Sequence, residues 1–177
     1  RKALLPLLYS AHVYPVPYPV VGAITPWNYP YMNIWCDVVP ALIAGCAVII
    51  KPSEVTPFTA LFAAERLVAA GVPADVLQIV TGGSETGRAL VDHVDLVAFT
   101  GSTATGRAIA MRCAERLIPC SLELGGKDAL IVLDDADLDL AALCAVRGGL
   151  ENAGQACVGV ERVYVEAGVY NRFIERL

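Results

Sequence analysis

Short apolar runs alternate with longer segments of helical periodicity over the first two thirds of the chain. The apolar runs cover residues 20–25, 46–50, 76–80, 96–99 and 120–124. The run at residues 46–50 is continuous, which is typical of a strand that is buried on both faces. The segments between them predict helices at residues 31–44, 57–70, 85–91 and 103–116. This alternation predicts an α/β fold, in which right-handed crossover helices cover both faces of a parallel sheet.

The second of these predicted helices carries signals at both ends. Thr56 can cap its N-terminus, and Pro57 suits its first position. Gly71 is suited to end it. Its apolar positions fall on one helical face, which we expect to be buried. The members of this face are Phe58, Leu61, Phe62, Val68 and Ala69.

The pattern starts again after Lys127, with a strand at residues 129–133, a helix at 138–150, a strand at 163–165 and a helix from residue 169. We therefore expect a domain boundary near Gly125-Gly126, between a domain of residues 18–125 and a second domain that begins at residue 126 and runs to residue 177. Residues 1–17 hold three prolines and two tyrosines and do not fit the alternation, so we interpret them as an extended arm.

Polar residues follow the predicted strands at four places, namely Asn28, Lys51-Pro52-Ser53-Glu54, Thr100-Gly101-Ser102 and Glu123. Ligands of open parallel sheets bind beyond the carboxyl ends of the strands, so these positions predict a ligand site. Taken singly, each has a purely structural alternative: a turn asparagine, a solvated turn, a packing turn and a strand-end carboxylate. Gly101-Ser102-x-x-x-Gly106 opens a helix whose N-terminus favours an anion, yet it matches neither G-x-G-x-x-G nor a P-loop.

Composition narrows the class of protein. The formal net charge is −5 with no basic stripe, which argues against nucleic acid as a partner. The longest apolar run, residues 38–50, contains Pro40 and Gly45 and falls short of the roughly 20 residues of a membrane span. The six cysteines form no C-x-x-C and no Cys/His pair at ligand spacing, so we expect no metal site, free thiols and a cytoplasmic location.

One of these cysteines stands in a distinctive frame. Cys157 ends Gly154-Gln155-Ala156-Cys157, and Glu123 lies in Leu122-Glu123-Leu124-Gly125-Gly126-Lys127. A thiol nucleophile and a carboxylate base, each in a Gly-flanked turn, are the groups that acyl-enzyme chemistry requires. A further buried thiol is the alternative for Cys157, and buried thiols are what we expect of the other five cysteines.

Together these segments resemble the aldehyde dehydrogenase superfamily, of the non-acylating NAD(P)-dependent type. The resemblance implies a Rossmann-like NAD-binding domain in residues 18–125, the start of the catalytic domain in residues 126–177, and a strand of the oligomerisation arm in residues 1–17. It further implies an aldehyde substrate and a homodimer or homotetramer for the complete protein. The chain is expected to be a fragment of that protein and inactive alone, since the rest of the substrate tunnel would follow Leu177.

The resemblance also implies roles for single residues. Cys157 is the nucleophile, Glu123 the base that activates water, and Asn28 a donor to the oxyanion; Glu123 and the positive nicotinamide are the candidate groups that help the thiol ionise. NAD is favoured over NADP, because the carboxylate of Glu54 would repel a 2′-phosphate. The implied cofactor-binding residues are Thr25, Pro26, Trp27, Lys51, Ser53, Glu54, Gly82, Gly83, Phe99, Thr100, Gly101, Ser102, Leu124 and Gly125.

Two other functions fit part of the pattern. A CoA-acylating relative would use the same thioester, but such enzymes generally lack a glutamate at the position of Glu123. An inactive cofactor-binding fragment is the second alternative. Ser84 takes a position near the cofactor that is often glycine in the family, and the identity of the aldehyde is left open by the sequence.

Overall fold

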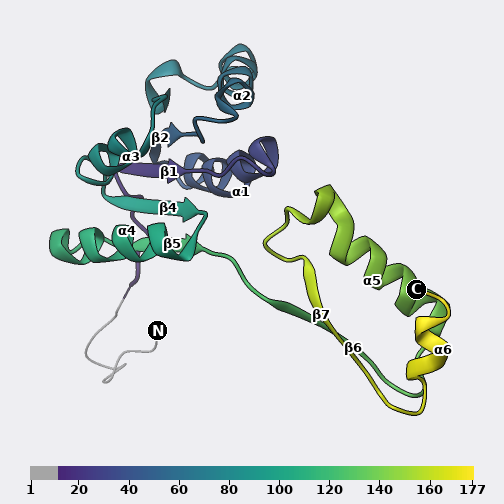
Figure 1. Cartoon of the computed structure of the whole chain (residues 1–177). Coiled ribbons are helices and arrows are strands. Elements are labelled where there is room, and N and C mark those ends of the chain that lie inside the picture. The colour runs from purple at the N-terminus through teal and green to yellow at the C-terminus, as the bar shows by residue number, and fades with distance from the viewer. Residues whose placement is uncertain (1–11) are drawn as a thin grey trace.

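The computed structural model describes residues 12–177, which form two lobes. Figure 1 shows a first lobe with a central sheet and its helices, and a second, smaller lobe reached through an extended connection after β5. The first lobe carries residues from β1 to β5, and the second carries β6, β7, α5 and α6.

The sheet of the first lobe is fully parallel, with strand order β3-β2-β1-β4-β5. This confirms the predicted parallel sheet, and each strand end differs from the predicted one by at most one residue. Parallel strands this short place their carboxyl ends along one edge. The strands are β1 Val20–Ile24, β2 Ala47–Lys51, β3 Leu77–Ile79, β4 Leu96–Thr100 and β5 Cys120–Glu123, with a short 3-10 helix, Ala74–Val76, before β3.

Helices cover both faces of this sheet, as predicted. On one face α1 (Pro30–Ile43) and α2 (Pro57–Ala69) bury Ile34, Val38 and Ala60 against the strands. On the other face α3 (Ser84–Val91) and α4 (Thr103–Arg116) do the same with Leu90 and Ile109. Strand β1 contributes alternate residues to the two clusters, which is the period-2 pattern of a strand buried on both sides.

The prediction for the buried face of α2 was wrong. Phe58 is 82% exposed and Phe62 54%, and the other three predicted members are also exposed. The buried side chains are Ala60 and Ala63, with Leu67 packed beside them. Small residues let α2 approach α1 and the sheet closely, and this close approach decides the orientation of the helix rather than the size of its apolar residues.

The start of α2 also differs from the expectation. Pro57 takes the first position and Thr56 the cap position, but the Thr56 hydroxyl makes no capping hydrogen bond and is buried without a partner among the residues described. Side-chain caps are present elsewhere. Ser102 accepts from the Thr105 backbone N–H at 3.3 Å, and Asp137 caps α5.

The second lobe pairs β6 (Asp128–Val132) with β7 (Val160–Val165) in parallel. Helix α5 (Leu138–Leu150) crosses between them, and α6 (Tyr170–Ile174) packs Phe173 into the same small core. The predicted restart of the strand-helix-strand pattern after Lys127 is therefore confirmed. The domain boundary near Gly125-Gly126 stays a prediction, and it falls in the connection between the two sheets.

Two further predictions concern the N-terminal arm and the burial of the cysteines. Of the expected arm, residues 1–11 lie outside the described residues, and residues 12–17 are exposed and in no strand. Among the cysteines expected to be buried, Cys36 and Cys144 are exposed, because each lies on the outward face of its helix. Within residues 12–177, no helix has the length and apolarity that crossing a bilayer requires.

Candidate active site

The strand order creates a crevice at the carboxyl edge of the first sheet. Strand β1 lies between β2 and β4 in the sheet. The connection after β1 therefore leads toward β2, and the connection after β4 leads the opposite way, toward β5. Such a switch in direction is where open α/β sheets bind ligands. The segment after β1 carries Asn28, and the turn after β4 carries Gly101 and Ser102.

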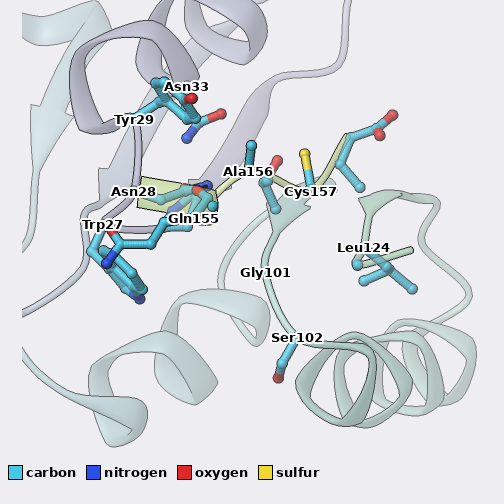
Figure 2. A pocket seen from close by; sticks show the side chains of 15 residues that line it. Trp27, Asn28, Tyr29, Asn33, Gly101, Ser102, Leu124, Gln155, Ala156 and Cys157 are labelled. Atoms are coloured by element: carbon cyan, nitrogen blue, oxygen red, sulfur yellow. Dashed lines mark hydrogen bonds between the residues drawn. The ribbon is translucent and has the colours of Figure 1, made fainter. Parts of the chain in front are cut away.

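A pocket of about 340 Å³ lies at this crevice, and we call it the cysteine pocket. It brings together Asn28 from the β1–α1 turn, Glu123 from the end of β5 and Cys157 from the second lobe. Figure 2 shows Cys157, Ala156 and Gln155 on the loop beside Asn28. The three residues predicted to share a site, which are far apart along the chain, therefore line one pocket. Its lining is Pro26, Trp27, Asn28, Tyr29, Asn33, Thr100, Gly101, Ser102, Glu123, Leu124, Gly125, Gly154, Gln155, Ala156 and Cys157.

Asn28 connects the two lobes through hydrogen bonds. Its Nδ2 donates to the Gln155 carbonyl at 2.8 Å, and its own carbonyl accepts from Asn152 Nδ2 at 3.0 Å. Since a backbone carbonyl can only accept, the first bond fixes which way the Asn28 amide points. An amide nitrogen carries two hydrogens, so one donor of Nδ2 remains for a further acceptor in the pocket.

The loop before Cys157 adopts a left-handed turn, at Glu151–Gly154. Asn152 and Ala153 have φ values of 50° and 58°, a conformation that costs a non-glycine residue about 1 kcal/mol or more. The contacts to Asn28 hold this turn, and the Tyr29 hydroxyl donates to Glu151 Oε1 at 3.4 Å. Burial, together with the charge of Glu151, raises the pKa of Tyr29, which keeps its phenol protonated as a donor. The position of Cys157 thus depends on contacts with the β1–α1 turn.

The side chains of the predicted nucleophile and the predicted base are both accessible. Cys157 and Glu123 are exposed while lining the pocket, so Glu123 is not the buried carboxylate that its apolar sequence context would produce. The Glu123 carbonyl accepts from the Gly101 backbone N–H at 2.9 Å, which ties the end of β5 to the turn after β4. Partial burial, and then the charge of Glu123, raise the pKa of Asp37 on α1.

A larger cleft of about 840 Å³, the strand-end cleft, continues from the cysteine pocket. The two share Pro26, Trp27, Thr100, Gly101 and Ser102, so a long ligand in the cleft would reach the cysteine pocket. The cleft runs between α3 and α4 and past the end of β2. Its remaining lining is Ile24, Thr25, Lys51, Ser53, Glu54, Gly83, Ser84, Gly87, Arg88, Val91, Asp92, Phe99, Ala104, Thr105, Ala108, Ile109 and Arg112.

The turn after β4 presents the N-terminus of α4 to the cleft. A Cβ added at Gly101 would lie 2.6 Å from Phe99 Cζ, and one added at Gly106 would lie 2.6 Å from Leu124 Cδ2. Gly101 therefore lets the turn sit directly on the Phe99 ring, whereas Gly106 serves the packing of α4. Free backbone N–H groups at the helix N-terminus suit an anion such as a pyrophosphate.

At the end of β2, Lys51 is 5% exposed and pairs with Glu54, with 3.2 Å between Nζ and Oε2. A hydrogen bond from its own backbone, and then the Lys51 ammonium, lower the pKa of Glu54. Glu54 is therefore held in its charged form, and this exposed carboxylate lines the cleft with part of its charge compensated by Lys51.

The structure brings most of the predicted cofactor-binding residues to these two hollows. Gly82 is the exception, because it lines neither. Its φ of 148° and the Thr86 Oγ1 atom, 2.1 Å from where a Cβ would lie, give Gly82 a conformational reason to be glycine instead.

Sequence reasoning missed the inner faces of α3 and α4 and, in the cysteine pocket, Tyr29 and Asn33. No motif marks these positions. Their only signal is that each helix starts directly after a strand that ends at the site, so one of its faces turns toward the cleft. The missed residues on these faces are Gly87, Arg88, Val91, Asp92, Ala104, Thr105, Ala108, Ile109 and Arg112.

Comparison with known proteins gives consistent matches. Residues 8–177 match the Aldehyde dehydrogenase family. A Mycolicibacterium smegmatis protein named "Putative succinate-semialdehyde dehydrogenase", with NADP(+) in its name, is 48% identical over 97% of this chain and 34% of its own length. The chain thus spans about a third of the length of this relative.

Solved structures agree in fold. An E. coli NADP-dependent enzyme superposes with a TM-score of 0.88 at 47% identity, over 91% of this chain and 34% of that one. A Mycobacterium tuberculosis aldehyde dehydrogenase complexed with NAD+ gives a TM-score of 0.85 at 45% identity, over 89% of this chain and 33% of that one.

Proposed function

The chain belongs to the aldehyde dehydrogenase family, and from this premise we propose that it supplies the cofactor cleft and the nucleophile of an enzyme that oxidises an aldehyde to a carboxylic acid with NAD(P)+. The observation that carries the proposal is the shared pocket of Asn28, Glu123 and Cys157, which opens into the strand-end cleft. The complete polypeptide that contains this sequence would be the active species.

The residues of the strand-end cleft fit a dinucleotide. The N-terminus of α4 with Gly101 and Ser102 would hold the pyrophosphate, and Lys51 and Glu54 would hold the adenosine ribose. The cleft volume of about 840 Å³ lies within the range of cofactor sites. When bound, NAD(P)+ supplies the hydride acceptor for the oxidation.

Cys157 would begin the reaction. Its exposed thiol, once ionised, adds to the carbonyl carbon of the aldehyde, and the new C–S bond leaves a negative charge on the oxygen. The second hydrogen of Asn28 Nδ2 and the backbone N–H of Cys157 would donate to this oxyanion. The Gln155 contact holds the Asn28 amide in place before the charge develops, so little reorganisation is needed.

The oxyanion becomes a thioester once the hydrogen on the same carbon has left as a hydride, for which NAD(P)+ would be the acceptor. Glu123 would then complete the cycle. It takes a proton from a water molecule, the water oxygen adds to the thioester carbon, and the C–S bond breaks to release the acid and the Cys157 thiolate. The exposure of Glu123 supports this role, because an exposed carboxylate can pass the proton on to solvent. Separating the oxidation from the hydrolysis in this way replaces one difficult step by two easier ones.

We propose a substrate class from the name of one relative. The name of the Mycolicibacterium smegmatis protein specifies succinate semialdehyde, so short aldehydes that carry a carboxylate belong in any substrate panel, next to aliphatic and aromatic ones. A rate preference for the first group over neutral aldehydes of equal length would support this class, and equal rates would contradict it.

Replacing Asn28 by alanine should lower kcat about 10²- to 10³-fold, the usual effect of removing an oxyanion donor. The matched control is Asn152→Gly, which removes the other hydrogen bond of the Asn28 segment but tolerates φ near 50°. Steady-state kinetics should show a much smaller loss for this control. If Asn152→Gly is as slow as Asn28→Ala, the hydrogen bonds serve to hold the loop and the donor role is wrong.

Replacing Gly101 by alanine should weaken NAD(P) binding by about tenfold or more, because the new Cβ would lie 2.6 Å from the Phe99 ring and displace the turn. Gly168→Ala is the control, since Gly168 lines neither hollow and a Cβ added there would meet no atom within 4 Å. Titration calorimetry measures both affinities. Equal affinities for the two variants would mean that the turn after β4 does not contact the cofactor.

A further inference from the structure

Asp37 on α1 is a half-buried carboxylate that takes no part in the reaction steps of Cys157 and Glu123. It precedes Val38, which is fully buried in the core of the first lobe. Burial, and then the charge of Glu123, raise the pKa of Asp37, and no hydrogen bond or cation among residues 12–177 opposes this rise. Such a carboxylate is unfavourable for folding, and perturbed carboxylates of this kind gather at functional sites.

Helix α1 begins beside the cysteine pocket, and one row of its side chains leads from the pocket to Asp37. Residues four positions apart share a helix face. Asn33 lines the pocket, and Asp37 follows it in the same row without lining the pocket itself. The adjoining row, with Ile34 and Val38, is buried in the core. Asp37 therefore stands behind the pocket wall, within reach of the charge of Glu123.

The other elements that pack against α1 bring no free charge to Asp37. These are β1, which has no titratable residue, β2 and α2. Lys51 at the end of β2 pairs with Glu54 at 3.2 Å. On α2, Arg66 lies 3.8 Å from Glu65, and both are exposed. Glu123 is thus the charged group that acts on Asp37.

The surroundings of Glu123 do not neutralise the pair either. Strand β4, its neighbour in the sheet, has no titratable residue. On α4, which packs against β5, Arg112 pairs with Glu115 at 2.7 Å, and Arg116 donates to backbone carbonyls. Among the described residues that line the cysteine pocket there is no lysine or arginine.

The remaining titratable groups nearby are neutral or engaged. On α4, Arg107 is exposed and lines neither hollow, and burial first of all raises the pKa of Cys113 to about 11, which keeps this thiol uncharged. In the loop of the second lobe, Glu151 accepts from the Tyr29 hydroxyl. Cys157 carries no charge during hydrolysis, because its sulfur is then part of the thioester.

We propose that Asp37 is a positioning residue for the hydrolysis step, whose negative charge behind the pocket wall makes Glu123 a stronger base toward the attacking water. The inference rests on the proposed function. Two carboxylates close together resist ionisation of both, so the repulsion is relieved when Glu123 takes the proton from water. Asp37 itself gains and loses no proton in this step. The exposure of Glu123 lets solvent and salt screen the interaction, so we expect a moderate effect.

The test follows the acyl-enzyme in a single turnover of the complete polypeptide that contains this sequence, by acid quenching and mass measurement at a series of pH values. Asp37→Asn should slow the decay of the acyl-enzyme about three- to tenfold at neutral pH. The pH at which this decay reaches half its maximum should fall by about 0.5 to 1. Formation of the acyl-enzyme should stay within about twofold of wild type.

Two further variants separate charge from structure. Asp37→Glu keeps the negative charge and should keep the wild-type midpoint of the pH profile. Asp75→Asn is the matched control, because Asp75 is an exposed aspartate of the first lobe that lines neither hollow. Asp37→Asn should melt at a temperature no lower than wild type, since asparagine removes a charge that burial disfavours. Added salt should reduce the difference between Asp37→Asn and wild type.

Three results would overturn the inference. An unchanged midpoint in Asp37→Asn would mean that Asp37 does not act on Glu123. An equal shift in Asp37→Glu would mean that the shape of the side chain matters and its charge does not. Slower formation of the acyl-enzyme with an unchanged pH profile would make Asp37 a purely structural residue. A wild-type protein that forms no acyl-enzyme would instead refute the proposed function itself.

Discussion

Cys157→Ala, made in the complete polypeptide that contains this sequence, should lose aldehyde oxidation by roughly 10⁴-fold or more. Removing the nucleophile of a covalent mechanism removes the whole acylation route, so the loss is far larger than that of an oxyanion donor. Binding of NAD(P) should persist, because Cys157 lines the cysteine pocket but not the strand-end cleft. NADH formation and cofactor titration measure the two quantities.

The control for this prediction is a second exposed thiol. Cys144 lies on α5 and lines neither hollow, so Cys144→Ala should retain wild-type turnover. Thiol-directed inhibition should likewise persist in Cys144→Ala and disappear with the activity in Cys157→Ala. Turnover that survives the loss of Cys157 would refute the assignment of the nucleophile.

Glu123→Gln should separate the two halves of the reaction. Glutamine keeps the shape of the side chain but accepts no proton from water, so Cys157 should still acylate while hydrolysis stalls. Rapid mixing should record a burst of about one NADH per site, followed by a steady rate that is lower by about 10²- to 10⁴-fold. Glu175→Gln is the control, since Glu175 is an exposed carboxylate of the second lobe outside both hollows.

A Glu123→Gln protein with wild-type turnover would mean that Glu123 is not the base for deacylation. Product formation that depends on added CoA would then favour a CoA-acylating enzyme. Absence of both the burst and the steady rate would mean instead that Glu123 is needed earlier, for ionisation of the thiol.

The strands could be predicted from the sequence because five short, mainly apolar runs alternate with segments of helical periodicity. A strand such as β2, Ala47–Lys51, is covered by helices on both faces, so its own run of apolar residues is enough to predict it. The buried face of α2 could not be predicted in the same way. There the close approach to α1 selected Ala60 and Ala63 and left Phe58 in solvent, which depends on the spacing between elements and not on hydrophobicity.

The part of the site that could be predicted from the sequence is the set of residues at or just after the strand ends. Asn28, Gly101 and Glu123 each follow a strand that the pattern identifies, and parallel strands bring such turns to one edge. The frame of Cys157 pointed to chemistry, but its place beside Asn28 depends on a left-handed turn and on contacts across the lobes.

Features without a local signal could not be found in this way. Arg88 stands in an ordinary helical segment, and only the fold places it in the lining of the strand-end cleft. Apolar context was an equally poor guide to the burial of the thiols, since Cys36 and Cys144 are exposed. In both cases the outcome depends on which face of the helix packs against the neighbouring elements.

The most direct test of the central claim is the mass of the peptide that carries Cys157, after Glu123→Gln protein has been mixed with an aldehyde and NAD+ and quenched in acid. The account predicts an increase equal to one acyl group, located on Cys157 and absent when NAD+ is left out. An unmodified Cys157 together with NADH formation, or an acyl group on another residue, would contradict it.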